Sequence, residues 1–326
     1  MKIAILYAEV NSQSSKDDLD VLVQVEAVRR SLLELGHEIL PLPVTLDLQK
    51  TVLDLGRLNP DLVFNLVESL AGTGRFLHFA PALLEWLSIR FTGAGSESLY
   101  VTTNKILTKE RLRYSDVDTP DWMSGSRLSN PDAAFNPPYI VKPACEDASI
   151  GLDEASIVGE REDLDRVWKE KTDRYGDCFI ESFVDGREFN VSLLGNGGTG
   201  AQVLPVAEIL FDAFPSGKPR IVGYEAKWES DSFEYHNTPR NFDYPAEDRG
   251  LLERLSAIAG QCWNLFDLCG YARIDFRVDQ DGRPWVIEIN ANPCISPDAG
   301  FTAAAERAGI SYNSMIERIV ESASFT

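Results

Sequence analysis

The chain has 326 residues, 44% hydrophobic and 25% charged, which is typical of a soluble globular protein with room for two or three domains. Its formal net charge of −20 argues against nucleic acid or an anionic membrane as a partner, because both need a basic surface. The five cysteines lack paired metal spacing, and the apolar start is too short for a signal peptide or a membrane span. We therefore expect a cytoplasmic protein with reduced thiols.

The first 97 residues alternate short apolar strands with helices. Strands are predicted at residues 2–7, 38–42, 61–65 and 90–92, and a helix at 21–35. Gly36 is expected to end this helix, because glycine tolerates the left-handed backbone that follows a helix. The pattern indicates an α/β domain, with a parallel sheet covered by helices on both faces.

The rest of the chain is predicted to be α+β. Strands are expected at residues 139–142, 178–184, 188–194, 202–208, 272–278 and 284–290, with helices at 246–268 and at the C-terminus. A long polar segment at 210–245 is typical of an active-site lid. We predict three domains, at residues 1–97, 98–184 and 185–326.

The most informative stretch is ARIDFRVDQDGRPWVIEINANP, at residues 272–293. Polar and apolar residues alternate on both sides of the Asp-Gly pair at 281–282, which is a strong signal for a two-residue hairpin turn. Counting outward from this turn places Asp275 opposite Glu288 on neighbouring strands. Two facing carboxylates repel each other, so a fold that places them there needs a compensating charge.

The same counting places Arg273 opposite Asn290, beside the two carboxylates. Carboxylate and amide oxygens are the ligands that Mg²⁺ prefers, and its remaining positions go to water and nucleotide phosphates. The pattern therefore favours a metal–phosphate site over a solvated face of the sheet.

Three other segments carry residues suited to a nucleotide, and each also has a plainer explanation. Lys142 ends an apolar strand before the small-residue loop around Ser149, which suits a phosphate group or a strand end in solvent. The strand edge at 180–184 could pair with adenine and Glu188 with a ribose, although such a segment is more often plain sheet. Lys227, beside a tryptophan, could reach a γ-phosphate or belong to an ordinary surface loop.

In their order along the chain, these motifs resemble the ATP-grasp superfamily, and most of all the D-alanine–D-alanine ligases. The motifs are NK at 104–105, YIVKPACEDASIG at 139–151, IESFVDGREF at 180–189, YEAKW at 224–228 and ARIDF…VIEINANP at 272–293. The resemblance extends, with gaps, over nearly the whole chain. It implies the ATP-grasp fold, in which an N-terminal parallel-sheet α/β domain precedes two α+β domains that clasp ATP.

The resemblance also implies a reaction. ATP phosphorylates a substrate carboxylate, and an amine then attacks the acylphosphate to form an amide or dipeptide. The implied cofactors are ATP and two Mg²⁺ ions, for which Mn²⁺ can substitute. The implied partners are small-molecule substrates, and the dimers common among such ligases leave a homodimer open.

The family's nucleotide residues correspond to positions of this chain. Lys105 and Lys142 would hold the α- and β-phosphates. The adenine would lie against Glu181 and Val184, and its ribose against Glu188.

The catalytic residues of the family also have counterparts. The implied ligands of the Mg²⁺ ions are Asp275, Glu288 and Asn290. Arg273, together with the backbone N–H of Cys294, would stabilise the oxyanion of the tetrahedral intermediate. Lys227 would close over the γ-phosphate.

Several positions depart from the family. Ala148 stands where the phosphate loop has a serine, and Trp228 where the lid has a tyrosine. Glu68 replaces a histidine, and Ala299, next to Asp298, replaces the serine that grips a substrate carboxylate.

The acid that binds the first amine in this family has no clear counterpart, and Asp17 is only a loose candidate. Since the ATP and metal residues stay while the amino-acid residues change, we expect an active ligase with a divergent substrate site. Glu68, Trp228 and Asp298 would contact the substrate, and the two acids favour a cationic group. True D-alanine–D-alanine ligation, an intramolecular cyclo-ligase and a non-catalytic nucleotide-binding protein are the alternatives.

Overall fold

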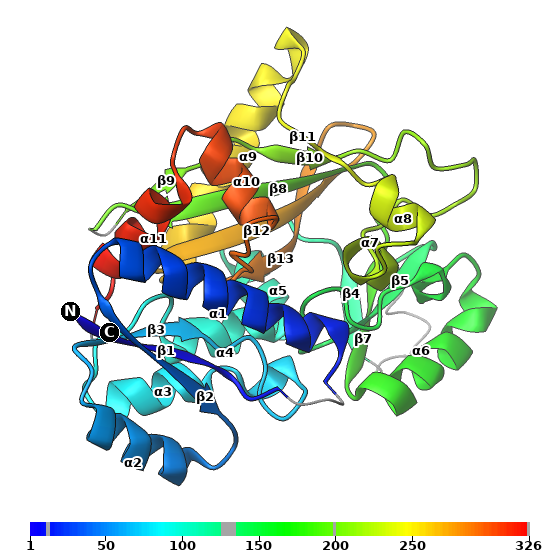
Figure 1. The fold of residues 1–326 in the computed structure, drawn as a ribbon. Coiled ribbons are helices and arrows are strands. Elements are labelled where there is room, and N and C mark those ends of the chain that lie inside the picture. Colours follow the sequence, from blue (N-terminus) through cyan, green and yellow to red (C-terminus); the bar gives the residue numbers. More distant parts are fainter. Residues whose placement is uncertain (11–13, 125–134, 198–199, 325–326) are drawn as a thin grey trace.

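The computed structural model describes residues 1–10, 14–124, 135–197 and 200–324, which form three β-sheets in succession along the chain (Figure 1). The first sheet is parallel, and the other two are antiparallel. The predicted α/β start and α+β remainder are therefore confirmed. No helix in these ranges is long and apolar enough to cross a membrane.

The N-terminal sheet has the strand order β2-β1-β3. Its strands are β1 (Lys2–Ala8), β2 (Glu38–Val44) and β3 (Leu62–Leu66), and its helices are α1 (Lys16–Glu34), α2 (Leu48–Leu58) and α3 (Phe79–Trp86). Ile3 and Ile5 of β1 share a core with α1, whereas Ala4 and Leu6 share one with α2 and α3. Both faces of this sheet are covered, as predicted.

The strand predicted at 90–92 is wrong. Phe91 forms isolated bridges to Val63 of β3 and to Ser324 but no strand, and Gly93, with its positive φ, follows two residues later.

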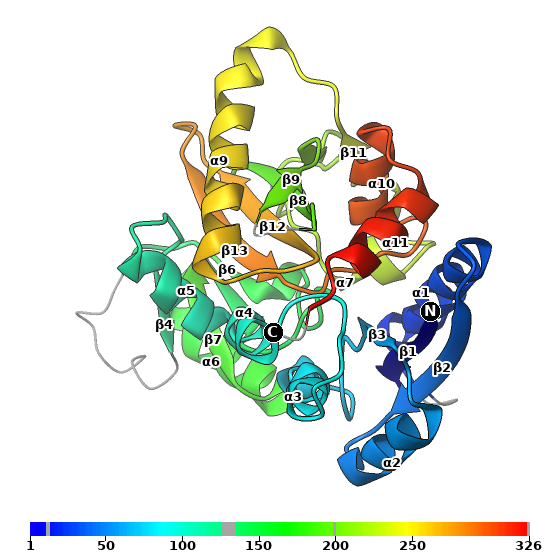
Figure 2. The same ribbon diagram turned by 90° about the vertical axis from the view of Figure 1, so that its left-hand side faces the viewer.

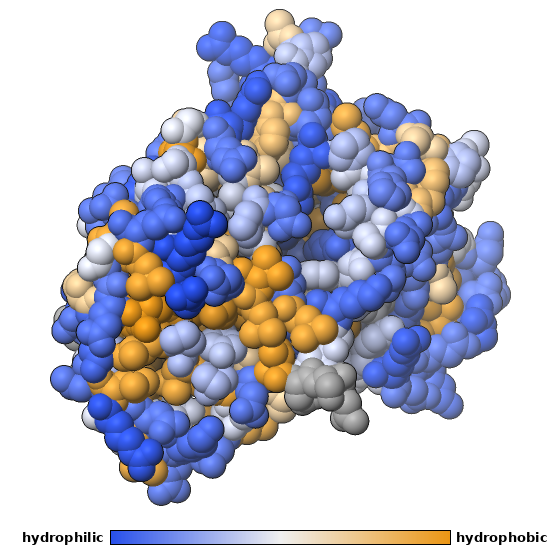
Figure 3. Space-filling view, in the orientation of Figure 1, coloured by the Kyte–Doolittle hydropathy of each residue, from blue (hydrophilic) through white to orange (hydrophobic). Residues whose placement is uncertain are grey.

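Helix α1 begins at Lys16, earlier than the predicted start at residue 21. Ser15 caps it by accepting a hydrogen bond from the backbone N–H of Asp18. Apolar side chains gather in the region of α1 on the face shown in Figure 3. Leu22 and Leu33 are among the exposed apolar residues of this helix.

The middle sheet has the strand order β4-β7-β5-β6. Its strands are β4 (Trp122–Ser124), β5 (Tyr139–Pro143), β6 (Ile157–Val158) and β7 (Cys178–Ser182), and the helices of this region are α4 (Ser96–Thr103), α5 (Lys105–Tyr114) and α6 (Arg161–Tyr175). Leu164 and Val167 of α6 pack on Val141 and Ile180 of the sheet. This buries one face of the sheet, and on the other face Ile140, Lys142 and Glu181 of the central strands β5 and β7 line the cavity described below.

The third sheet has the order β11-β10-β8-β12-β13, with β9 also paired to β8. Its strands are β8 (Arg187–Gly195), β9 (Ala201–Val203), β10 (Ala207–Ile209), β11 (Arg240–Asn241), β12 (Tyr271–Val278) and β13 (Pro284–Asn290). Its helices are α9 (Arg249–Leu265), α10 (Gly300–Arg307) and α11 (Tyr312–Glu321), and Figure 2 shows α9 on one side of the sheet and the other two across from it. The single strand predicted at 202–208 is wrong: Pro205, which has no N–H to donate, separates β9 from β10.

The segment at 210–245 contains two short helices, α7 (Tyr224–Trp228) and α8 (Phe233–His236), rather than a loop alone. It lies against the loop that follows β5, where the N–H of Tyr224 donates to the carbonyl of Leu152 at 2.9 Å. A Cβ on Gly223 would lie 2.8 Å from the same carbonyl, so this close approach requires glycine.

The β12–β13 hairpin keeps the predicted pairing of the site residues but not the predicted turn. Asp275 faces Glu288, whereas beyond a bulge Phe276 faces Val286, so Ile287 is an extra residue on β13. The tip is therefore not a two-residue turn; it is closed by a hydrogen bond from the N–H of Asp279 to the carbonyl of Arg283.

Candidate active site

A cavity of about 1270 Å³ lies where the three sheets and the segment at 210–245 meet. Every site residue predicted from the sequence lines it: Glu68, Lys105, Lys142, Ser149, Glu181, Val184, Glu188, Lys227, Trp228, Arg273, Asp275, Glu288, Asn290, Cys294 and Asp298. These residues come from distant parts of the chain, so the fold brings the whole predicted set to one place. Their individual roles stay predictions.

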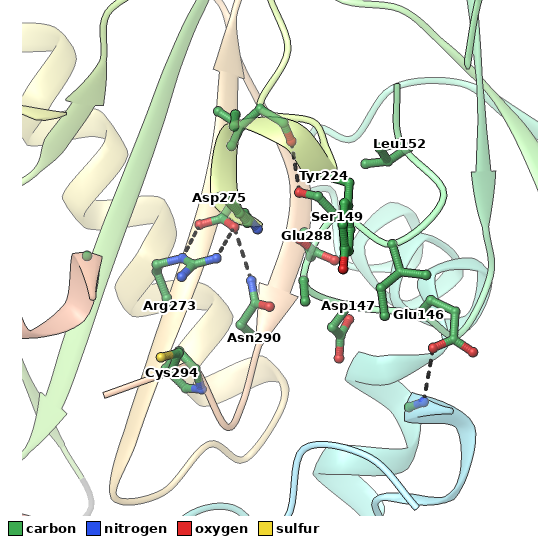
Figure 4. A pocket seen from close by; sticks show the side chains of 18 of the residues that line it. Glu146, Asp147, Ser149, Leu152, Tyr224, Arg273, Asp275, Glu288, Asn290 and Cys294 are labelled. Atoms are coloured by element: carbon green, nitrogen blue, oxygen red, sulfur yellow. Dashed lines mark hydrogen bonds and ion pairs between the residues drawn. The ribbon is translucent and has the colours of Figure 1, made fainter. Parts of the chain in front are cut away.

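The hairpin residues form one connected group in the cavity, as Figure 4 shows. The guanidinium of Arg273 donates two hydrogen bonds to Asp275, at 2.7 and 2.8 Å. The amide of Asn290 donates to the same carboxylate at 3.1 Å, and that of Asn190 at 2.8 Å. Asp275 is only 5% exposed, so this buried carboxylate is held by four donated hydrogen bonds.

Glu288 is compensated by a second cation. The Nζ of Lys105, at the start of α5, lies 2.8 Å from its carboxylate and 3.1 Å from that of Asp147. Burial alone would raise the pKa of Glu288, but Lys105 and Lys227 hold it below its usual value. Burial raises the pKa of Asp147, and Glu288 adds to the rise, against the opposing charge of Lys105. Asp147 was seen in the sequence only as an acidic loop residue, and the structure adds it to the site.

The Nζ of Lys142 on β5 lies 2.6 Å from the carboxylate of Glu181 on the neighbouring strand β7, diagonally across the pair. The other carboxylate oxygen of Glu181 lies 2.5 Å from the Nζ of Lys109, which the sequence analysis missed. Burial opposes ionisation of Glu181, but the two lysines lower its pKa below the usual value. Glu181 therefore stays charged beneath the predicted adenine position.

The segment at 210–245, the predicted lid, lies over the loop at 143–151 that was predicted to hold phosphate. The indole N–H of Trp228 donates to the carbonyl of Ala148 at 2.9 Å, and the hydroxyl of Ser149 donates to the carbonyl of Val222 at 2.8 Å. Lys227, on the same helix, lines the cavity; burial lowers its pKa, and nearby Arg273 lowers it further. An ammonium in this position is suited to an anionic group of a ligand.

The opposite end of the cavity is acidic, and α1 contributes to it. The carboxylate of Asp20 accepts a hydrogen bond from Ser296 at 3.0 Å and lies 3.3 Å from the sulfur of Cys294. Glu68 accepts a hydrogen bond from the amide of Gln24 at 2.7 Å. Burial raises the pKa of Glu68 to about 7, and the charge of Asp20 adds to the effect.

Sequence reasoning missed Asp20 because it started the helix at residue 21, and it missed Gln24 because the contact of Gln24 with Glu68 spans 44 positions. The Ser15…Asp18 spacing at the start of α1 is a helix N-terminus signal that would have placed both residues on one helical face. The side chain of Asp17, the earlier candidate, lies outside the described part of the chain.

Asp298 lies at the exposed rim of the cavity rather than inside it. Its backbone carbonyl accepts a hydrogen bond from Arg240 at 3.0 Å. A cation beside Asp298 weakens the expectation that this residue alone recognises a positive substrate group.

The donor set of the hairpin fits Mg²⁺ held together with a nucleotide, rather than a metal held by protein alone. Asp275, Glu288 and Asn290 supply hard oxygen ligands on one face of the sheet. Among the described residues, no group of three His, Cys, Asp or Glu side chains could hold a metal ion. Phosphate oxygens would complete such a site.

The chain is similar to ligases over its whole length. A family model described as D-ala D-ala ligase C-terminus matches residues 111–321. An uncharacterised protein of Sinorhizobium fredii, y4sG, is 34% identical over 263 residues, covering 80% of this chain and 74% of that protein. The D-alanine–D-alanine ligase of Aquifex aeolicus is 28% identical, over 98% of this chain and 100% of its own length.

Solved structures give the same fold. A crystal structure of D-alanine–D-alanine ligase from Bacillus anthracis has a TM-score of 0.73 at 22% identity, covering 99% of this chain and 97% of that one. A second structure of that ligase, complexed with ATP, has a TM-score of 0.72 at 21% identity, covering 99% and 96%.

The fold is therefore that of the ATP-grasp enzymes, as predicted. The chain belongs to the D-alanine–D-alanine ligase family. The predicted class of enzyme, an ATP-dependent ligase that forms C–N bonds, is confirmed at the level of this family.

Proposed function

We propose that the chain joins a carboxylate to an amine through an acylphosphate, using ATP, on a substrate pair other than two D-alanines. The observation that carries the proposal is that one cavity is lined both by Lys105, Lys142 and Lys227 and by the paired carboxylates Asp275 and Glu288. Three cations and two metal-ligand carboxylates suit a triphosphate with Mg²⁺.

Within this proposal the chain's own residues position the reacting groups. Lys105 and Lys142 hold the α- and β-phosphates, and Lys227 reaches the γ-phosphate from the lid. Asp275, Glu288 and Asn290 hold Mg²⁺, which neutralises charge on the phosphates when bound. Arg273 and the backbone N–H of Cys294 stabilise the oxyanion formed when the amine attacks.

In this proposal the nucleotide binds between the domains at 98–184 and 185–326. The domain at 1–97 closes the acidic end of the cavity, lined by Asp20 and Glu68, which we call the substrate end. The three sheets and the cavity between them support this division.

The acidic residues at the substrate end favour a substrate that carries a positive group. Asp20 and Glu68 line it, and among the described side chains neither forms an ion pair. An ammonium bound between them would replace the missing counter-charge and favour the ionised form of Glu68. The uncharacterised relative is 34% identical, against 28% for the ligase of Aquifex aeolicus, which is compatible with a different substrate.

The test is phosphate release from Mg·ATP by the purified protein, across D- and L-amino acids, diamines and hydroxy acids, with mass spectrometry of active mixtures. We expect a product lighter by one water than the two substrates together, and the strongest signal with a substrate that carries an extra amine. A preference for two D-alanines would overturn the divergent site. Loss of water within one molecule would indicate a cyclo-ligase, and bound ATP without turnover on any substrate would indicate a non-catalytic protein.

A further inference from the structure

Arg277 is a buried arginine in the wall of the cavity that the reaction above does not use. It lies on β12 and is 4% exposed. Its Cα partner across the sheet is Glu188 of β8, the residue predicted to bind the ribose. An arginine buried this deeply is costly unless its donors are satisfied, so its contacts show what it is for.

Three of these contacts join separate parts of the nucleotide region. Nη1 of Arg277 donates to Oε2 of Glu188 at 2.9 Å and to the backbone carbonyl of Arg220 at 2.8 Å. Nε donates to the carbonyl of Val184 at 3.0 Å, in the connection between β7 and β8. One side chain therefore ties the ribose residue, the predicted adenine edge and the lid segment together.

The guanidinium also lies near aromatic rings on both segments that it joins. The centre of the Phe183 ring is 5.6 Å from its carbon atom Cζ, and that of Phe211 is 6.0 Å away. These contacts hold the guanidinium near two rings, of which that of Phe183 lines the cavity.

The arrangement leaves hydrogen-bonding capacity unused on both members of the ion pair. Nη2 of Arg277 is buried and has no partner, within the described part of the chain. Glu188, 9% exposed, accepts a hydrogen bond at Oε2, and no described residue donates one to its Oε1. Buried groups with unused capacity next to a cavity are the groups that a ligand satisfies.

We propose that Arg277 is a nucleotide-positioning residue: it fixes Glu188 by one oxygen so that the other accepts a ribose hydroxyl, and it couples nucleotide binding to seating of the lid. The inference rests on the proposed function, since it assumes a nucleotide in this cavity.

The first test compares the affinities of ATP, 2′-deoxyATP and 3′-deoxyATP, measured with Mg²⁺ by calorimetry and without any second substrate. The wild type is expected to bind one deoxy analogue on the order of tenfold more weakly than ATP, because it loses a charge-assisted hydrogen bond. In Arg277→Met this discrimination falls to about twofold or less, because Glu188 has lost the group that orients it. Arg187→Met is the matched control. Arg187 lies on β8 and pairs with Glu208 and Asp248, but it does not line the cavity.

A double-mutant cycle separates positioning from structural support. If Arg277 acts through Glu188, then Arg277→Met adds little to the loss caused by Glu188→Gln. Equal weakening of all three nucleotides by Arg277→Met, with an additive cycle, would overturn the inference. A wild type that binds no nucleotide would instead overturn the proposed function itself.

Arg277→Lys keeps a charge opposite Glu188 and so tests the lid without leaving that carboxylate unpaired. A lysine cannot reach the carbonyls of Val184 and Arg220 together with the carboxylate. We expect this variant to keep the ribose discrimination, while trypsin cleaves the Arg220–Ile221 bond severalfold faster in the ATP-bound state than in the wild type. Unchanged cleavage would overturn the coupling to the lid.

Discussion

The two ends of the cavity balance their charges in different ways. One end, which we call the metal end after its proposed ligand, contains Asp275 and Glu288. Each of these carboxylates is paired with a cation of the chain itself, Arg273 for Asp275 and Lys105 for Glu288. At the substrate end Asp20 and Glu68 accept hydrogen bonds from neutral groups, and neither forms an ion pair with a described side chain. The metal end is therefore preorganised before any ligand arrives, whereas the substrate end has negative charge that a substrate must neutralise.

The largest effect is expected when the metal end loses its charge. Glu288→Gln keeps the shape of the side chain but removes one anionic metal ligand, and it leaves Lys105 with Asp147 alone. We expect kcat to fall on the order of 10³-fold, since a metal ion stabilises a transferring phosphoryl group by several kcal/mol. Phosphate release measures the loss.

The matched control for this variant is Glu170→Gln, at an exposed residue of α6 that does not line the cavity. It should keep wild-type activity. If Glu288→Gln retained more than a tenth of the wild-type kcat, the assignment of Glu288 to the metal would be wrong.

The second prediction concerns Mg²⁺ without nucleotide. Because Arg273 and Lys105 already neutralise the two carboxylates, the protein alone should bind Mg²⁺ only weakly. Calorimetry with and without ADP should show an affinity at least about 10²-fold higher when the phosphates are present, since they complete the oxygen ligands. Tight binding to the protein alone would show that the chain's cations move aside without a nucleotide.

The substrate end predicts a pH effect. The pKa of Glu68 in the folded protein, about 7, is above its usual value of 4.5, so the unfolded chain loses this proton first as pH rises. Its contribution to stability is present at low pH and is lost between about pH 4.5 and 7. Burial is the main cause of the raised pKa; Gln24 and Arg273 lower it, whereas the charges of Asp20 and Asp147 raise it.

Between pH 5 and pH 8 the free energy of unfolding should therefore fall less in Glu68→Gln than in the wild type, by on the order of 2 kcal/mol. Urea unfolding of both proteins at both pH values measures this difference. The same variant should raise KM for an amine-bearing substrate about tenfold, because a neutral amide cannot balance a cation. Identical pH profiles of wild type and variant would show that Glu68 does not titrate in this range.

The smallest effect is expected at the lid. Trp228→Phe removes the indole N–H that donates to Ala148 while keeping most of the ring. A neutral hydrogen bond contributes about 1 kcal/mol, so we expect kcat/KM for ATP to fall about fivefold. Trp86→Phe, at a side chain that is 72% exposed on α3, is the control and should change nothing. An unchanged kcat/KM in Trp228→Phe would show that this bond does not help to seat the lid.

Local patterns in the sequence predicted the parts of the fold and site that neighbouring residues determine. The pairing of Asp275 with Glu288 follows from alternation along two strands joined by a short turn, and it is correct although the turn itself is not. The N-terminal parallel sheet follows from apolar strands alternating with helices.

The remaining site contacts join residues too far apart in sequence for any local pattern to show them. Ser296 reaches Asp20 across 276 positions, and Arg277 reaches the carbonyl of Arg220 across 57. Such contacts depend on how the sheets pack against one another. Only the N-terminal capping signal of α1 could have corrected the helix start in advance.

The extra residue Ile287 has a consequence for how the hairpin tolerates change. A one-residue slip between paired strands normally turns every side chain to the other face of the sheet. Here the bulge absorbs such a slip between the tip and the pair formed by Asp275 and Glu288. For this tip the bulge therefore restores the pairing of the two carboxylates that a two-residue turn without a bulge would give.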